Sequence, residues 1–202
     1  MTLRVAIASE YHACDGELYR YLIELVRGSP VTAWCGTYAF TGCKSVAKLA
    51  PAFLTAAAAA GVQHALLAID NDGAGKSRLE HESTCTPVAF AIADDDSCRE
   101  CWLSQSINPP PPSWVTVGGQ HGVAVPVQTM EAWLLAIRDG LADPERQYNR
   151  RVLKTQFYGK PTPPAAARTQ LALAVLQRPD ALDVLRQRPS FQRFEAVVTA
   201  WT

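Results

Sequence analysis

The sequence lacks an excess of charge of either sign. Its 202 residues contain 19 Lys and Arg and 19 Asp and Glu, so the formal net charge at pH 7 is zero. The overall charge therefore does not predict the broad basic field of many nucleic-acid-binding proteins. Nucleic acid remains a candidate partner, because a metal ion together with a local group of Lys and Arg side chains can hold phosphates.

The sequence also lacks long apolar runs. None approaches the roughly 18–20 residues that a membrane span needs, and the first ten residues, M-T-L-R-V-A-I-A-S-E, contain no signal-peptide core. We expect a cytoplasmic protein with no membrane partner. In that compartment the six cysteines are better interpreted as thiols or metal ligands than as disulfides.

Strand-like and helix-like segments alternate in the first third of the chain, which with 48% hydrophobic residues can form one domain with a full core. We expect strands at 3–9, 31–38 and 65–69, and helices at 17–27 and 45–60 with a break near Pro51. The crossovers are long enough to join parallel strands. This pattern predicts an α/β fold with a parallel sheet flanked by helices.

The later elements are less regular. Residues 114–117 and 123–127 are both β-like, and one of them is expected to be the next strand; a helix with Thr129 as its N-cap follows. After the linker 161–164, helices are expected near 165–177, 179–188 and 190–201. We therefore expect a core of residues 1–142 and a C-terminal helical subdomain of residues 143–202 packed on it.

Carboxylates follow two of the expected strands. Glu10 comes after the first strand, and Asp70 and Asp72 come after the third. The carboxyl ends of parallel strands meet at one edge of a sheet, where Glu131, in the first turn of a helix, can also reach. Crowded carboxylates favour a hard divalent cation. The alternatives are a solvated turn at 70–73 and an acid that only complements the dipole of its helix.

A second group of metal-binding residue types lies between the third strand and the next. His81, Cys85, Cys98 and Cys101 are spaced H-x3-C-x12-C-x2-C, which is typical of a structural Zn²⁺ site. Zinc would also explain how residues 76–112, with little apolar content, could be ordered. Two alternatives remain open, a redox pair formed by Cys98 and Cys101, and buried thiols with no common role.

Basic residues precede the C-terminal helices. They are the best candidates for phosphate contacts in the second half of the chain, and the alternative is an ordinary solvated face. These residues are Arg146, Arg150, Arg151, Lys154 and Lys160.

The acidic pieces, taken in order, resemble a Toprim domain. The resemblance rests on Glu10 after the first strand, the Asp70-x-Asp72 pair after a later strand, and Glu131 in Q-T-M-E-A-W-L. The resemblance covers about residues 3–137. It is strongest with small stand-alone bacterial Toprim-like proteins of the overcoming-lysogenization-defect nuclease type, several of which are linked to phage defence. Tyr11 stands where the family usually has glycine, and the Cys/His segment lies outside the common Toprim core.

The resemblance implies a phosphodiester reaction that depends on Mg²⁺ or Mn²⁺. Asp70 and Asp72 would hold the metal, Glu10 would be a ligand or a general acid/base, and Glu131 would complete a second metal position. Lys76 and Arg78 would neutralise phosphate charge.

Three functions follow as hypotheses. The first is a nuclease or related phosphoryl-transfer enzyme that acts on nucleic acid, DNA before RNA, or on a nucleotide, and that works in phage defence with a protein partner. The second is a non-catalytic regulatory module that binds nucleic acid or protein. The third is a redox protein that uses Cys98 and Cys101.

Overall fold

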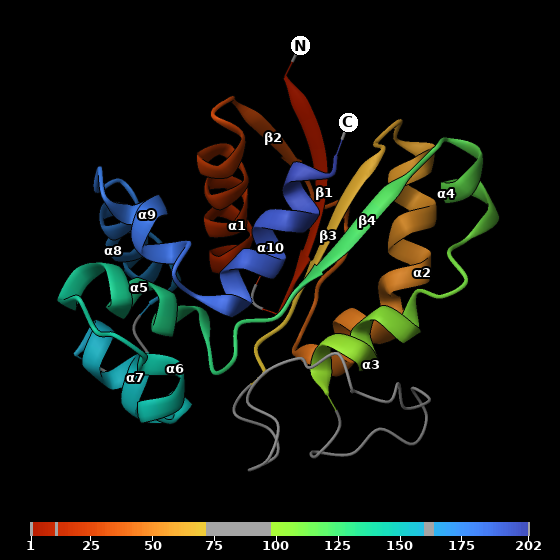
Figure 1. Cartoon of the computed structure of the whole chain (residues 1–202). Helices are drawn as coiled ribbons and strands as arrows, with labels where there is room; N and C mark the ends of the chain where they lie inside the picture. The colour runs from red at the N-terminus through yellow and green to blue at the C-terminus, as the bar shows by residue number, and fades with distance from the viewer. Residues whose placement is uncertain (1, 11, 72–97, 160–163, 202) are drawn as a thin grey trace.

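The computed structural model describes residues 2–10, 12–71, 98–159 and 164–201 (Figure 1). Within these residues, four strands form one sheet: β1 (Leu3–Ser9), β2 (Val31–Trp34), β3 (His64–Ala68) and β4 (Gln120–Ala124). All neighbouring strands are parallel, in the order β2-β1-β3-β4. The predicted α/β class and the parallel sheet flanked by helices are confirmed, and the topology is compatible with a Rossmann-like fold.

Helices cover both faces of the sheet. The chain steps from β1 outward to β2 through α1 (His12–Arg27), and then crosses back past β1 to β3 through α2 (Cys43–Ala59). Right-handed crossovers in opposite directions place these two helices on opposite faces. The side chains of β1 alternate accordingly: Val5 and Ile7 belong to the core on the α1 side, and Ala6 and Ala8 to the core on the α2 side.

Three elements of the first half differ from the prediction. Strand β2 ends at Trp34, and α1 begins at His12 rather than at residue 17. Helix α2 runs through Pro51 without the expected break. Pro51 is exposed, while Phe53 and Leu54 are fully buried on the sheet side of the helix, so packing holds the helix together around the proline.

The region before β4 was partly mispredicted. Residues 112–116 form a short helix, α4 (Pro112–Thr116), although W-V-T-V is a β-like sequence. Pro112 stands in the first turn, a position that favours helix, and Trp114 is buried against α2. The next strand is β4, which starts three residues earlier than the 123–127 run and includes His121 and Gly122.

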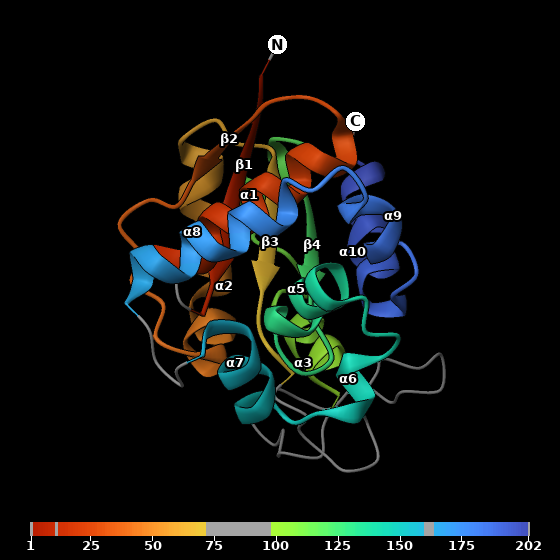
Figure 2. The ribbon, with the colours of Figure 1, turned by 90° about the vertical axis from the view of Figure 1, so that its left-hand side faces the viewer.

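The remaining helices are α3 (Arg99–Ser106), α5 (Met130–Asp139), α6 (Pro144–Gln147), α7 (Arg150–Tyr158), α8 (Ala165–Leu176), α9 (Ala181–Leu185) and α10 (Pro189–Thr199). The three helices predicted after the linker are therefore present. Helix α8 lies along α1 (Figure 2), and α10 lies across β4 (Figure 1). Side chains of α7 to α10 share one apolar core with α1, α5 and the sheet. In the described part of the chain, no helix is long and apolar enough to cross a membrane.

Candidate functional site

The arrangement of the strands singles out one edge of the sheet. From β1 the chain goes to β2 on one side, while β3 lies on the other side, so the direction of winding changes between β1 and β3. In open α/β sheets, ligands bind outside the carboxyl ends of the strands at this switch point. Glu10 directly follows β1, and Asp70 follows β3 after a single intervening residue. Two of the predicted site residues therefore lie where the topology predicts a site.

Glu10 and Asp70 are joined by a hydrogen bond. The backbone N–H of Asp70 donates to Oε1 of Glu10 at 3.0 Å. The Glu10 residue is only 7% exposed, so its carboxylate lies close to the protein interior. This bond connects the ends of two neighbouring strands and holds the carboxylate of Glu10 beside the backbone of Asp70.

Glu131 belongs to the same group of charges. It lies in the first turn of α5 and is only 3% exposed. A second buried carboxylate holds this helix in place: Oε1 of Glu145 accepts hydrogen bonds from Val127 N–H at 3.0 Å, Trp133 Nε1–H at 3.1 Å and the Ser190 hydroxyl at 2.8 Å. The chain leaving the sheet, the start of α5 and α10 are thereby connected, which fixes the position of Glu131.

The carboxylates repel one another. Burial raises the pKa of Asp70 well above its usual range, the negative charge of Glu131 raises it further, and Glu10 and Asp15 add to the effect, while Lys154 opposes it. Structure and electrostatics therefore bring together Glu10, Asp70 and Glu131. Asp72, the fourth predicted acid, lies outside the described residues.

Two cations from the C-terminal helices lie against these acids. Lys154 Nζ of α7 is 3.8 Å from Asp70 Oδ2. The Arg168 guanidinium of α8 is 3.7 Å from Glu131 Oε1 and 3.8 Å from Asp15 Oδ1. Lys154 was among the predicted phosphate contacts. Sequence analysis does not predict Arg168 or Asp15 for the site, because nothing in the local sequence marks either residue.

The structure describes the side chains of only two of the other predicted cations. Arg150 and Arg151 are exposed on α7. Lys160 lies outside the described residues, as do Lys76 and Arg78, and the side chain of Arg146 is likewise not described.

Two tyrosines complete the surroundings of the acids. Tyr19 is buried, and burial together with the negative charges of Asp70 and Asp15 raises the pKa of its phenol well above the usual range. Burial also raises the pKa of Tyr158, with a further contribution from Glu131. The guanidinium of Arg168 lies 5.6 Å from the centre of the Tyr158 ring. Both phenols therefore stay neutral at physiological pH and add no further negative charge.

The donor set fits a hard divalent cation held partly by water. Carboxylate oxygens are the ligands that Mg²⁺ and Mn²⁺ prefer, and Mg²⁺ usually takes one or two protein carboxylates and several waters. Among the described residues, no three or more His, Cys, Asp or Glu side chains are arranged to hold a metal together. The repulsion between Asp70 and its acidic neighbours is nevertheless the condition that a divalent cation relieves.

The predicted zinc site is described only in part. Cys98 is buried at the N-cap position of α3, and Cys101 is partly buried within that helix. His81 and Cys85 lie outside the described residues. The zinc site and its alternatives remain predictions.

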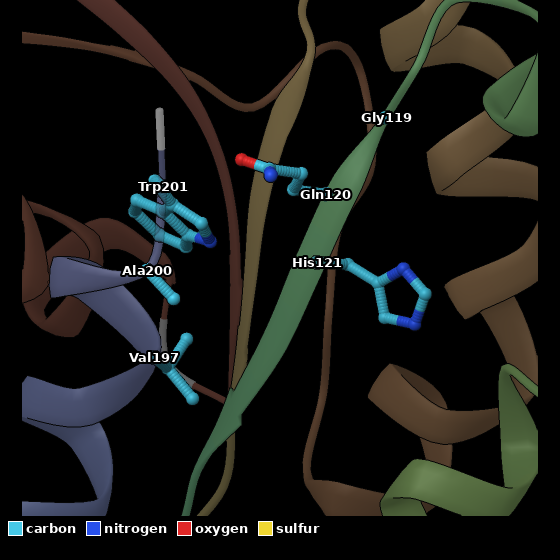
Figure 3. Close-up of a pocket in the computed structure, with 6 residues that line it drawn as sticks. All are labelled: Gly119, Gln120, His121, Val197, Ala200 and Trp201. Carbon is cyan, nitrogen blue, oxygen red and sulfur yellow. The ribbon is translucent and has the colours of Figure 1, made fainter.

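A pocket lies near the opposite edge of the sheet, beside the start of β4. This pocket of about 400 Å³ lies between β4 and α10 (Figure 3). Its lining residues are Gly119, Gln120, His121, Val197, Ala200 and Trp201. The His121 ring points away from Trp201, and its Nδ1 accepts a hydrogen bond from Trp114 Nε1–H at 3.2 Å. The pocket thus lacks the gathered charges of the carboxylate edge, which is the stronger candidate site.

Comparison of the chain with protein-family models, with curated proteins and with solved structures finds no match in any of the three, so a functional assignment rests on the sequence and the site geometry.

Proposed function

We propose that this protein is a divalent-metal-dependent phosphoryl-transfer enzyme, a nuclease that acts on nucleic acid at the carboxyl edge of β1 and β3. The observation that carries the proposal is the Asp70 carboxylate, which is 15% exposed and lies at the switch point of the sheet beside Glu10 and within the negative field of Glu131. Keeping like charges together costs free energy, and proteins keep such clusters mainly where function needs them. The resemblance to Toprim domains, based on the same acids, supports the same chemistry.

The carboxylates would have different roles in the reaction. Asp70 and Glu10 would hold Mg²⁺ or Mn²⁺, which supplies Lewis-acid stabilisation of a phosphoryl oxygen when bound. Glu131, fixed by the Glu145 network at the start of α5, would orient metal-bound water or complete a second metal position.

Purified full-length protein tests the proposal. It is incubated with Mg²⁺ or Mn²⁺ and supercoiled, linear and single-stranded DNA, RNA or nucleotides, and metal binding is measured by calorimetry. We expect saturable metal binding and cleavage of at least one nucleic acid. Asp70→Asn should abolish both. The matched control is Asp183→Asn, because the Asp183 side chain is 82% exposed and lies on α9.

The contrary result is equally definite. If wild-type protein binds neither metal and cleaves none of these substrates, the proposed function is wrong. If Asp70→Asn and Asp183→Asn cleave equally well, the activity does not belong to this site.

One observation favours a second candidate function, a non-catalytic binding module. Lys154 and Arg168 already compensate part of the charge of Asp70 and Glu131 within the protein itself. A purely structural ion-pair network would show the same contacts. Metal titration separates the two functions, because a structural network of this kind needs no divalent cation.

A further inference from the structure

Two cations at the carboxylate edge come from the part of the chain that follows all four described strands. Lys154 lies on α7 and Arg168 on α8. Their side chains are only 15% and 17% exposed. Lys and Arg are seldom buried this far without a partner of opposite charge, and here both face the same group of acids. Their position is therefore a property of the site rather than of the general surface.

The ion pairs in the site are longer than most of the described pairs on the surface, although Arg186 and Asp183 also lie 3.9 Å apart. Lys154 and Arg168 stand 3.7–3.8 Å from their carboxylate oxygens. On the surface, Arg138 lies 2.7 Å from Asp139, and Arg178 lies 2.9 Å from Asp180. Charge-assisted hydrogen bonds are typically about 2.7–2.9 Å long. The site pairs compensate charge electrostatically without that short geometry, so a competing ion can replace one partner at a small cost.

Acids outnumber cations among the described groups that these contacts name. Among the described residues, Glu10, Asp15, Asp70 and Glu131 face Lys154 and Arg168. When all four acids are ionised, these six groups carry a net charge of two negative units, which is the charge that one divalent cation neutralises. After that neutralisation the attraction holding Lys154 and Arg168 to the carboxylates is weakened, and both can attract another anion.

We propose that Lys154 and Arg168 form the phosphate-binding subsite of the proposed active site, and that they move from the carboxylates to a phosphate of the nucleic acid when a divalent cation neutralises the acids. The inference rests on the proposed function. The planar guanidinium of Arg168, placed over the Tyr158 ring, suits two phosphate oxygens, and the ammonium of Lys154 supplies a compact charge. Binding of metal and of phosphate would thus be positively coupled.

Two binding measurements on the full chain test this subsite. Calorimetry with Mn²⁺ reports metal affinity. Fluorescence anisotropy of a labelled, phosphorothioate-linked oligodeoxynucleotide reports phosphate binding at several salt concentrations, with and without Mn²⁺, and gel electrophoresis confirms that the probe stays intact. The variants are Lys154→Met and Arg168→Met. The controls are Lys48→Met, exposed on α2, and Arg178→Met, in an exposed pair.

The two readouts should change in opposite directions. Lys154→Met and Arg168→Met should each bind Mn²⁺ several-fold more tightly, because a competing positive charge has been removed. With Mn²⁺ present, each should bind the oligonucleotide about tenfold more weakly and lower the salt dependence by about one unit. Without Mn²⁺, wild-type protein and both variants should bind the probe equally weakly. The control variants should match wild type.

Other outcomes overturn the inference. If Mn²⁺ affinity in both variants is unchanged or weaker and oligonucleotide binding equals that of the controls, the two cations have only a structural role. If Arg168→Met does not fold, Arg168→Lys keeps the charge and loses the planar fork, and it should bind the probe with intermediate affinity; wild-type affinity would contradict the proposal. Wild-type protein that binds neither Mn²⁺ nor the probe refutes the proposed function itself. Metal-dependent cleavage with variants that behave like controls refutes only the subsite.

Discussion

Asp70 donates its backbone N–H to the carboxylate of Glu10, and this 3.0 Å bond joins the ends of two adjacent parallel strands. The same carboxylate therefore satisfies a main-chain donor and carries a charge of the proposed metal site. These two roles can be separated by substitution, because an amide oxygen accepts a hydrogen bond but bears no charge.

Glu10→Ala and Glu10→Gln should differ in stability and agree in metal binding. Alanine leaves the Asp70 N–H without its acceptor, which should lower the free energy of unfolding by about 1–3 kcal/mol. Glutamine can keep the bond and should unfold at nearly the urea concentration of wild type. Both should lose Mn²⁺ binding in calorimetry. Equal destabilisation by the two substitutions would show that the hydrogen bond contributes little.

Asp70→Asn should stabilise the metal-free protein at neutral pH. The pKa of Asp70 is raised in the folded state, so between the unfolded and the folded pKa the folded protein holds a proton that the unfolded chain has already lost. The favourable contribution is complete below the unfolded pKa of about 4 and is lost as the pH rises through the folded pKa. Asparagine cannot ionise and avoids that loss.

Thermal unfolding in EDTA and in Mg²⁺ measures this effect. At pH 7 in EDTA, Asp70→Asn should melt at a higher temperature than wild type. Added Mg²⁺ should raise the melting temperature of wild type and leave the variant unchanged. A variant that melts below wild type in EDTA would show that the Lys154 contact outweighs the repulsion from the acids.

His121 should give a pH dependence of the opposite sign. Burial lowers its pKa, and Nδ1 accepts the hydrogen bond from Trp114, which protonation of that nitrogen would break. Its contribution to stability is present above the unfolded pKa of about 6.5 and is lost as the pH falls through the lowered folded pKa.

Urea unfolding of wild type and His121→Gln between pH 5 and pH 8 isolates this contribution. The difference in unfolding free energy between the two proteins should be largest at pH 8 and should shrink toward pH 5. Asp70 changes equally in both proteins, so its effect cancels. A difference that does not vary with pH would mean that folding does not change the pKa of His121.

Gly122→Ala should destabilise the packing of α10 on β4. An added Cβ would come within 2.1 Å of Val197 Cγ1, so the helix or the strand must shift. Overpacking of this kind typically costs about 1–3 kcal/mol. Val197→Ala should recover part of that loss in the double variant, which a double-mutant cycle by chemical unfolding detects. Strictly additive effects would contradict the close contact.

The residues of the site that could be predicted are those that follow a recognisable strand pattern in the sequence. The apolar run before Asp70 indicates a doubly buried strand, and parallel pairing then places Glu10 and Asp70 at one edge. Strand β4 begins earlier than the predicted 123–127 run. Gln120 and His121 interrupt the apolar pattern there, and the need for glycine at position 122 comes from close packing against Val197 of α10, which is distant in sequence. Arg168 was missed for the same reason: its place in the site depends on the packing of α8 along α1.

The separation of charges along the chain has a consequence for biosynthesis. A ribosome completes all four described strands, together with Glu10, Asp70 and Glu131, before it reaches Lys154 and Arg168. Until then, a nascent chain carries acids that the two later cations do not yet compensate. Under the proposed function, such a chain would attract divalent ions but would lack Lys154 and Arg168, the two cations of the proposed phosphate-binding subsite. Incomplete chains would therefore bind nucleic acid poorly, and the capacity to cleave it would arise only after the C-terminal helices have been made and docked.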